Sequence, residues 1–300
     1  MTGALIECVP NFSEGRDPEK VGAIVEAIRS AGAAVLGQTS DPDHNRSVVT
    51  FAGHPDAVAE AAFRGVARAV DLIDLRTHHG VHPRLGAADV VPFVPVREAS
   101  MQDCIRVAER IGERVWRELG VPVYLYEAAA RRPDRVRLED VRRGQFEGVR
   151  EEVRTNPARV PDFGGAELHP TAGASIVGAR NFLVAFNVNL ATSDVSIARQ
   201  IARSVRASSG GLPHVKAMGV LLASRGLAQV SMNLTDFETT PLHRVYTAVA
   251  QEAARLGVGI AGSEIIGLVP RRALEQVAEA FLRLENFRTG MVLENRLEQF

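Results

Sequence analysis

Apolar residues recur along the chain with alternating helical and strand spacings, which predicts an α/β protein. In the first helix Val21, Ile24 and Ile28 fall on one face, and Gly32 ends it. The elements predicted for this part are a strand over 4–10, a helix over 18–31, strands over 33–39 and 47–51, a helix over 55–70, and a closing strand over 72–75.

The first half continues beyond this βαββαβ unit. A strand-like run over 88–96 contains Pro92 and Pro95, Ser100 caps a helix to Leu119, and 121–125 forms a further strand. The arginine-rich stretch 127–160 is predicted to be a solvated surface, because blocks of charge are usually exposed.

The second half repeats the same order of elements. The prediction is a strand over 182–190, a helix over 194–207, strands over 215–222 and 227–234, a helix over 241–256, and a strand over 258–262. The fold class is therefore α/β, an α+β sandwich of two tandem ferredoxin-like βαββαβ subdomains. Each is expected to be a mixed sheet with helices on one face. The expected subdomains are residues 1–178 and 179–300, and Gly164–Gly178 is expected to be a linker or a ligand-covering loop.

Composition and charge narrow the function classes. Lysine and arginine number 35 against 36 acidic residues, a formal charge of −1, which argues against a broad nucleic-acid footprint. The apolar runs are too short for a bilayer, and the N-terminus lacks a signal-peptide pattern. Cys8 and Cys104 lie far apart without a CxxC spacing, which favours a reducing compartment. Together with the short apolar runs, this predicts a cytoplasmic protein with no membrane partner.

Three histidines, His78, His79 and His82, lie within five positions. A zinc site is weighed because the first and last are four residues apart. Gly80 and Pro83 break any helix here and the HExxH glutamate is missing, so no metal is predicted. A catalytic histidine fits better, since imidazole both takes and gives a proton near neutral pH. The other interpretation is a polar surface loop with incidental histidines.

Three further segments place polar or flexible residues at the ends of predicted elements. Residues 9–15 form either a carboxylate-binding helix N-terminus or a simple capped turn. In 41–46, Arg46 is either a carboxylate clamp or an ordinary exposed arginine. The glycine-rich segment 161–174 would let the backbone approach a flat ligand. Neither a P-loop nor a GxGxxG motif is present.

Together these segments resemble glutamate formimidoyltransferase (formiminotransferase). The strings that carry the resemblance, over nearly the whole chain, are Glu7–Gly15, Asn45-Arg46, His82-Pro83-Arg84, Val121–Tyr126, Pro161–Gly164, Gly178–Arg180, Phe186–Leu190, Ala228–Leu234 and Gly267–Pro270. Individually they are weak, and in this order they are specific.

The resemblance implies two α/β subdomains with folate in a tunnel between them, and a homodimer. It implies transfer of a formimino group from N-formiminoglutamate to N5 of tetrahydrofolate, the co-substrate, in histidine degradation. The family's catalytic histidine falls on His82 and its folate-contacting loop on Gly164–Gly173. The candidate substrate- and folate-binding residues are Asn11, Asp41, Arg46, Arg84, Gly164, Gly165, His169, Thr171, Gly173 and Arg180.

Some features depart from the family. The chain ends at Phe300, without room for the cyclodeaminase module of the animal proteins, so we expect a monofunctional enzyme. Val81 stands where animal members have an acidic residue, so the carboxylate expected to orient His82 must come from elsewhere, Asp41 or Glu7. No tryptophan in Gly164–Gly173 is available to stack on the pterin.

Two other functions compete with the transferase. A metal-dependent hydrolase of formiminoglutamate would use the three histidines and no folate. A non-catalytic folate-binding or assembly protein would keep the fold and lose turnover.

Overall fold

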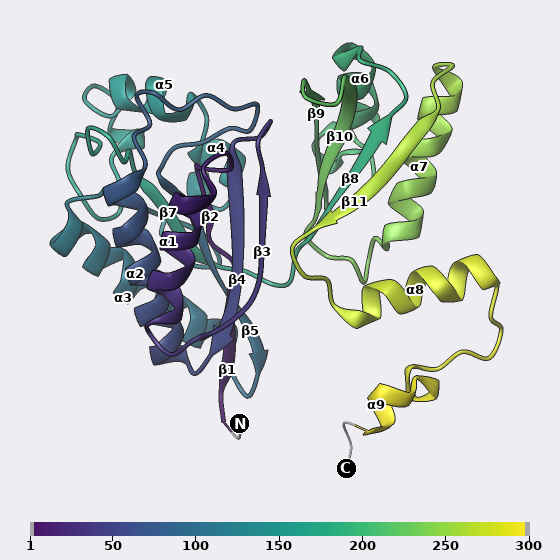
Figure 1. The fold of residues 1–300 in the computed structure, drawn as a ribbon, viewed down its shortest axis with the longest axis horizontal. Coiled ribbons are helices and arrows are strands. Elements are labelled where there is room, and N and C mark those ends of the chain that lie inside the picture. The colour runs from purple at the N-terminus through teal and green to yellow at the C-terminus, as the bar shows by residue number, and fades with distance from the viewer. Residues whose placement is uncertain (1–2, 298–300) are drawn as a thin grey trace. The chain divides into compact units, whose positions relative to one another are not determined.

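The computed structural model describes residues 3–297 and divides the chain into two compact units, Met1–Asn181 and Phe182–Phe300 (Figure 1). Each unit contains the βαββαβ order of a ferredoxin-like fold, as predicted. The first unit adds further helices and two parallel strands to that order. The subdomain boundary between residues 178 and 179 stays a prediction.

The sheet of the first unit is mixed, as predicted. Its strands are β1 (Leu5–Cys8), β2 (Asn11–Phe12), β3 (Ala34–Asp41), β4 (Arg46–Gly53), β5 (Ala88–Arg97), β6 (Val123–Glu127) and β7 (Ser175–Ala179). Their order is β3–β4–β1/β2–β5–β7–β6, and β1 and β2 both pair with β4 and β5. β7 is parallel to β5 and β6, and the other pairs are antiparallel.

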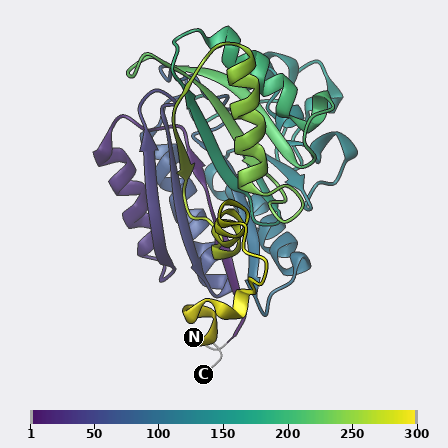
Figure 2. The ribbon, with the colours of Figure 1, turned by 90° about the vertical axis from the view of Figure 1, so that its right-hand side faces the viewer.

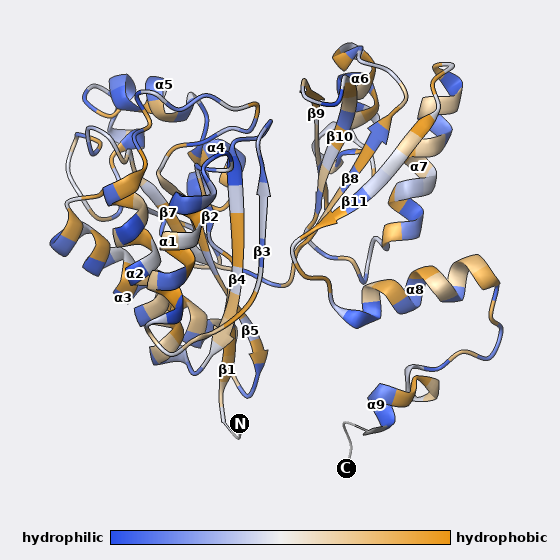
Figure 3. Ribbon diagram, in the orientation of Figure 1, coloured by the Kyte–Doolittle hydropathy of each residue, from blue (hydrophilic) through white to orange (hydrophobic). Residues whose placement is uncertain are grey.

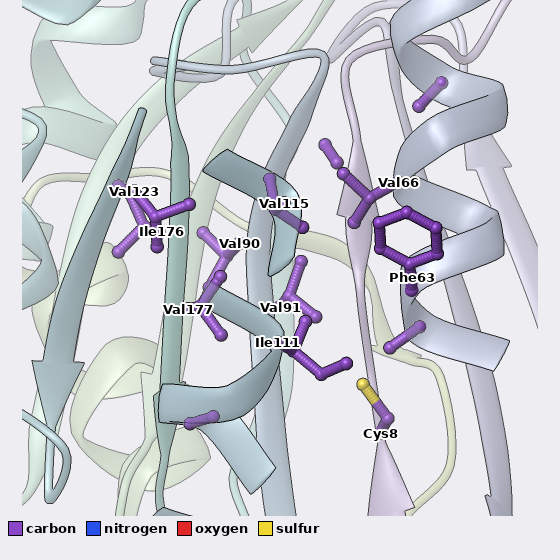
Figure 4. Close-up of a cluster of buried hydrophobic side chains, with 14 of the residues drawn as sticks. Cys8, Phe63, Val66, Val90, Val91, Ile111, Val115, Val123, Ile176 and Val177 are labelled. Atoms are coloured by element: carbon purple, nitrogen blue, oxygen red, sulfur yellow. The ribbon is translucent and has the colours of Figure 1, made fainter. Parts of the chain in front are cut away.

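Three amphipathic helices cover one face of this sheet: α1 (Pro18–Arg29), α2 (Pro55–Leu72) and α3 (Met101–Leu119) (Figure 1). Asp17 caps α1, and Ser100 with Asp103 forms a capping box at α3. Figure 4 shows part of the core between helices and strands, with Phe63, Val66, Ile111, Val115, Cys8, Val91 and Val177.

Two predictions about strands in this unit were wrong. Residues 72–75 are no strand, because α2 runs to Leu72 and the closing strand is β5. The second error concerns Gly164–Gly178, whose last residues begin β7, a buried strand between β5 and β6. A short apolar run fits a strand or a helix end equally well, and the many glycines before Ser175 conceal the strand.

The segment 127–160 is less solvated than predicted. It forms η1 (Pro133–Arg135), α4 (Leu138–Val141), α5 (Gln145–Glu152) and η2 (Pro157–Arg159). Val141, Phe146 and Val149 are buried, and Arg135 is only 3% exposed with its guanidinium over the ring of Tyr124. The aliphatic part of an arginine side chain can be buried while its guanidinium binds a carbonyl oxygen or an aromatic ring. A high density of charged residues therefore did not predict the burial of this segment correctly.

The second unit has the sheet order β11–β8–β10–β9. Its elements are β8 (Val184–Leu190), α6 (Val195–Val205), η3 (Ala207–Ser209), β9 (Val215–Leu222), β10 (Leu227–Leu234), α7 (Leu242–Arg255), β11 (Ile260–Ile266), α8 (Arg271–Leu282), η4 (Thr289–Met291) and α9 (Leu293–Leu297). The helices α6 and α7 pack on its strands, and Figure 2 shows α7 lying along its own sheet. Every described pair here is antiparallel, so this sheet is not mixed as expected. The helices α6 and α7 each connect two parallel strands, but an antiparallel strand lies between the two strands of each pair in the sheet.

The hydropathy of β4 changes along its length. In Figure 3, β4 changes from hydrophilic at its Arg46 end to hydrophobic further along. Val49 and Phe51 of β4 belong to the core, whereas Arg46 lies at the end where the predicted polar loops meet. None of the helices in residues 3–297 combines the length and the apolar character needed to cross a membrane.

Candidate active site

Three of the polar segments singled out in the sequence meet around Asn45. Its amide oxygen accepts from the Gly15 backbone N–H at 3.0 Å, and its amide nitrogen donates to the His79 carbonyl at 3.0 Å. A Cβ on Gly80 would lie 2.3 Å from the carbonyl oxygen of His44, so only glycine allows this approach. Segments 9–15, 41–46 and 78–82 therefore form one cluster of loops.

His82 is held by a backbone carbonyl. Its Nδ1 lies 2.8 Å from the carbonyl oxygen of Pro83. A carbonyl oxygen only accepts hydrogen bonds, so Nδ1 carries the proton and Nε2 of the neutral ring is an acceptor. Neither Asp41 nor Glu7, the carboxylates expected to orient His82, makes this contact. Pro83 supplies the orienting group.

A buried ion network lies behind that carbonyl. Arg142 Nη1 donates to the Pro83 oxygen at 2.9 Å and lies 3.5 Å from Asp89 Oδ2. Arg46 Nη1 donates to the same Asp89 oxygen at 2.8 Å, and the Leu85 backbone N–H donates to Oδ1 at 2.7 Å. Asp89 is 0% exposed. The Asp89 carboxylate therefore contacts both arginines and the backbone N–H of Leu85, three residues after His82.

A β-bulge places Asp89 in this network. Asn11 pairs with Val90 and Phe12 with Ala88, so Asp89 is the extra residue between two cross-strand pairs. Bulges redirect a side chain and are common beside active sites. The regular alternation of β5 is broken at the residue that binds both arginines.

The charges of this network set the protonation of His82. Burial, Arg46 and Arg142 together lower the pKa of His82 well below its usual value. Burial opposes the ionisation of Asp89, but Arg142 and Arg46 outweigh it and lower the pKa of Asp89. Burial also lowers the pKa of Arg46 to about 10, although Asp89 opposes this shift. Two cations and one anion leave one positive charge beside a neutral imidazole.

Two predicted site residues, Asn11 and Asp41, lie in the same cluster. Asn11 Oδ1 accepts from Arg46 Nε at 3.0 Å, and Asn11 Nδ2 donates to the Val9 carbonyl. Asp41 accepts from the His44 backbone N–H at 2.7 Å and lies 3.1 Å from its ring Nδ1. The ring of His44 is 6.0 Å from the ring of His82. Asn11 therefore positions Arg46, and Asp41 positions His44.

The other two histidines of the cluster do not share a centre with His82. His78 Nε2 lies 2.9 Å from the Asn45 carbonyl, and its Nδ1 accepts from Arg84 Nε at 3.2 Å. Both ring nitrogens of His78 are therefore occupied, whereas the side chain of His79 is exposed. Within residues 3–297 no three His, Cys, Asp or Glu side chains converge as metal ligands.

Arg84 is buried and already paired. Its two terminal nitrogens lie 2.8 and 2.6 Å from the Glu147 carboxylate. Arg84 is one of the predicted binding residues, and its guanidinium could hold a substrate carboxylate only after releasing Glu147. The turn 9–15 is likewise satisfied internally, because Glu14 Oε1 accepts the backbone N–H groups of Arg16 and Asp17. This geometry is that of a capped turn.

The end of the predicted folate loop is fastened to the chain that follows His82. Gly86 bridges to Gly173, and the Ala87 N–H donates to the Ala172 carbonyl at 2.9 Å. Gly173 has φ +69°, and a Cβ there would lie 2.1 Å from the Leu85 oxygen. His169 and Gly173 exchange two backbone hydrogen bonds, and Thr171 accepts one from Leu75. In the first half of the loop, Gly165 is exposed and Gly164 packs beside Pro122.

Arg180 lies at the end of β7, beside Glu7 and Tyr126. Burial raises the pKa of Glu7, and the charge of Arg180 opposes that rise. Burial also raises the pKa of Tyr126 to about 12, and Arg180 and Arg142 both act on it in the opposite direction. Tyr126 is thus within electrostatic reach of both arginines.

Asp89 and Arg142 were missed in the sequence. Asp89 could have been found as a single acid inside the apolar run 88–96, because a buried charge needs a partner. Arg142 is one of many arginines in 127–160, and nothing in the local sequence distinguishes it. Only the fold brings Arg142 to the Pro83 carbonyl.

The arrangement is suited to proton transfer on an anionic substrate. A neutral imidazole whose Nε2 is an acceptor can take a proton from a reacting group and return it. The surplus positive charge, together with the buried and unpartnered Nε of Arg142, favours a carboxylate nearby.

Two family descriptions match this chain. "Formiminotransferase domain, N-terminal subdomain" matches residues 5–180, and "Formiminotransferase domain" matches residues 185–297.

Named relatives resemble the chain over nearly its whole length. A Streptococcus pyogenes serotype M1 protein named glutamate formimidoyltransferase is 46% identical over 295 residues, 98% of each chain. A Thermoplasma acidophilum protein of the same name is 47% identical over 299 residues, 99% of this chain and 98% of its own. The Sus scrofa formimidoyltransferase-cyclodeaminase is 44% identical over 289 residues, 94% of this chain and 53% of that protein.

Proposed function

Because this chain belongs to the formiminotransferase family, we propose that it transfers the formimino group of N-formimino-L-glutamate to N5 of tetrahydrofolate. The products are 5-formiminotetrahydrofolate and glutamate, a step in histidine degradation and one-carbon metabolism. Tetrahydrofolate is then a co-substrate. The chain is a transferase, and neither the hydrolase nor the non-catalytic binding protein is favoured.

The reaction moves one proton between two nitrogens. N5 of the reduced pterin attacks the amidine carbon and forms a tetrahedral intermediate. Nε2 of His82 takes the proton that N5 loses and gives it to the glutamate nitrogen as the carbon–nitrogen bond breaks. The amidine is restored on N5, and glutamate leaves as the amine. His82 returns to its neutral form.

The observation that carries this role is the fixed tautomer of His82. The Pro83 carbonyl accepts from Nδ1 and leaves Nε2 as the proton acceptor. The lowered pKa of His82 keeps the ring neutral near neutral pH, and the imidazolium formed during the reaction is then a strong acid toward the leaving nitrogen.

Arg46 and Arg142 are the proposed anchors for the glutamate carboxylates. Both act electrostatically on His82, and within residues 3–297 both pair with the same carboxylate, Asp89. A substrate carboxylate would balance the remaining charge and occupy the free Nε of Arg142. Substrate binding by the predicted residues Arg84 and Arg180 stays a proposal, as do the folate contacts of Gly164, Gly165, His169, Thr171 and Gly173.

A single substitution, His82→Ala, tests the role of the imidazole. Turnover of tetrahydrofolate and formiminoglutamate should fall about 10²- to 10⁴-fold, the usual contribution of a general acid–base group. Affinity for 5-formyltetrahydrofolate should stay within about tenfold, since the change removes no charge.

His79→Ala is the matched control, because His79 is the exposed neighbour in the same loop and should keep wild-type turnover. Unchanged turnover in His82→Ala would remove His82 from the mechanism.

The cytoplasmic location and the homodimer are proposed from the resemblance to the family. The two cysteines are free and buried, which agrees with a reducing compartment. Light scattering of the purified chain would distinguish a 32.4 kDa monomer from a dimer.

A further inference from the structure

A second histidine, His44, lies beside His82 and has no part in the proton transfer proposed above. The ring centroids of the two histidines are 6.0 Å apart, and the rings are tilted by 55°. His44 is only 8% exposed, although it lies in the polar turn between β3 and β4. An imidazole this close to the proposed proton shuttle can contact the same small substrate.

Asp41 determines which ring nitrogen of His44 carries a proton. Asp41 Oδ1 accepts from the His44 backbone N–H at 2.7 Å and lies 3.1 Å from the ring Nδ1. Burial raises the pKa of Asp41, but hydrogen bonds from the side chain and backbone of His44 outweigh it, so that pKa is lowered. A carboxylate oxygen only accepts, so Nδ1 carries the proton and Nε2 of the neutral ring is an acceptor.

The group bound to Nδ1 distinguishes the two histidines. His82 is held by the uncharged Pro83 carbonyl and His44 by a carboxylate, so the Asp41–His44 pair is anionic when its ring is neutral. Nε2 of either ring has no hydrogen-bond partner among residues 3–297. The ion network behind the Pro83 carbonyl carries one surplus positive charge. A substrate with one cationic and one anionic end is complementary to this separation of charge.

We infer that Nε2 of His44 accepts a hydrogen bond from the terminal amidine nitrogen of formiminoglutamate and so selects formimino over formyl donors. An amidine is cationic at neutral pH, and its terminal nitrogen only donates. In N-formylglutamate an oxygen that only accepts replaces this nitrogen and would face Nε2 without a hydrogen between them. A site that hydrogen-bonds an N–H group rejects the analogue that lacks it. The inference rests on the proposed function, which makes formiminoglutamate the donor.

A protonated His44 is the competing arrangement. Its Nε2 would donate, and it would bind a carboxylate or a formyl oxygen of the substrate. The neutral ring is favoured because the two arginines beside Asp89 already provide positive charge for a carboxylate. An imidazolium would place a further positive charge next to a cationic amidine, whereas the anionic Asp41–His44 pair attracts it.

The test compares both donors in wild type and in His44→Leu by steady-state kinetics. The kcat/KM for formiminoglutamate should fall about 10- to 100-fold, the usual contribution of a hydrogen bond to a charged group. The kcat/KM for N-formylglutamate should stay within about threefold of wild type, since its oxygen makes no hydrogen bond to Nε2. A purely structural role of His44 would lower both values by the same factor.

Two further variants test the chemistry at this position. His44→Gln keeps a polar group and presents both an acceptor and a donor, so it should bind N-formylglutamate more tightly than wild type does. Asp41→Asn keeps an oxygen for Nδ1 and removes the charge, so it should weaken formiminoglutamate less than His44→Leu does. Asp41 is thus tested as a positioning residue.

Titration of both donors without folate separates recognition from turnover. The preference in Kd for formiminoglutamate over N-formylglutamate should shrink in His44→Leu by the same factor as the preference in kcat/KM. His54→Gln is the matched control, because His54 lies beside Asp56 at the exposed start of α2. It should keep the wild-type preference, and thermal melts of all variants would show whether the fold is retained.

An unchanged preference in folded His44→Leu and His44→Gln would overturn the inference, and so would an equal loss with both donors. A wild-type preference for N-formylglutamate would overturn it too, because Nε2 would then be a donor. If wild type binds formiminoglutamate and transfers nothing to tetrahydrofolate, the proposed function fails, and the two Kd values still decide the contact of His44.

Discussion

The imidazole of His82 is bound by a carbonyl oxygen where many catalytic histidines have a carboxylate. A carboxylate on Nδ1 would stabilise the imidazolium and raise its pKa, but the Pro83 carbonyl fixes the tautomer without a negative charge. Arg142 donates to that carbonyl and adds a positive charge nearby. Arg142 therefore orients the ring indirectly and, together with burial and Arg46, keeps it neutral.

The pH dependence of kcat/KM should report this arrangement. Burial and the two arginines disfavour imidazolium, so the acidic limb of the wild-type profile should lie below the usual histidine pKa of about 6.5. Arg142→Gln removes one positive charge and can still donate to Pro83, so the pKa of His82 should rise and the limb should move to higher pH.

Arg143→Gln is the control for this profile, because Arg143 is exposed and pairs with Asp140. Its acidic limb should coincide with that of wild type. A wild-type limb above pH 6.5, or no movement in Arg142→Gln, would contradict the electrostatic account.

At the scale of elements, the His82 loop is held where it enters β5. The bulge at Asp89 and the bridge between Gly86 and Gly173 lie within a few residues of each other. Pro92 is tolerated in this strand because it lies opposite the break between β1 and β2. Irregular pairing at one end of a regular strand thus connects the loops of the site.

Gly173→Ala should destabilise the fold through this connection. The positive φ of Gly173 and the 2.1 Å approach of a Cβ to the Leu85 oxygen predict a loss of about 2–4 kcal/mol in the free energy of unfolding. Urea denaturation measures it. Gly165→Ala in the same loop is the control, and it should change stability by less than about 0.5 kcal/mol because a Cβ there meets nothing. Equal effects of the two substitutions would disprove the strain.

At the scale of the whole molecule, each unit has its own hydrophobic core. One core is formed by residues between Ile6 and Ala179, and the other by residues between Val184 and Ala273. β7 is the last strand of the first unit along the chain and lies between β5 and β6 in its sheet. The first unit is therefore complete only when the chain has reached Ala179.

A fragment of residues 1–181 should fold by itself. It contains the whole first core and every strand of the first sheet, so a cooperative thermal transition is expected by near-ultraviolet circular dichroism. A fragment of residues 1–160 is the matched control. It lacks β7 and exposes the edges of β5 and β6, so it should melt without cooperativity. Similar melting of both fragments would show that β7 is dispensable.

Local patterns were sufficient for much of the fold. Strands 215–222 and 227–234 were predicted with the bounds that β9 and β10 have, because the Arg225-Gly226 turn separates two clear apolar runs. Ser100 and Pro55 likewise marked the beginnings of α3 and α2. The closing strand was misplaced to 72–75 and β7 was missed, since short apolar runs carry too little periodicity to be assigned alone.

The sequence by itself determined the family, the repeated βαββαβ order and the candidacy of His82, because local periodicity and short motifs encode all three. Only the tertiary structure decided what holds His82. Pro83 is adjacent to His82 in the sequence. Arg142, which donates to the Pro83 carbonyl, comes from a segment 59 residues further along the chain, and a β-bulge places Asp89 beside Arg142. The energy of an ion pair depends on the distance between its charges in the folded protein, and that distance cannot be read from the separation of the residues along the chain.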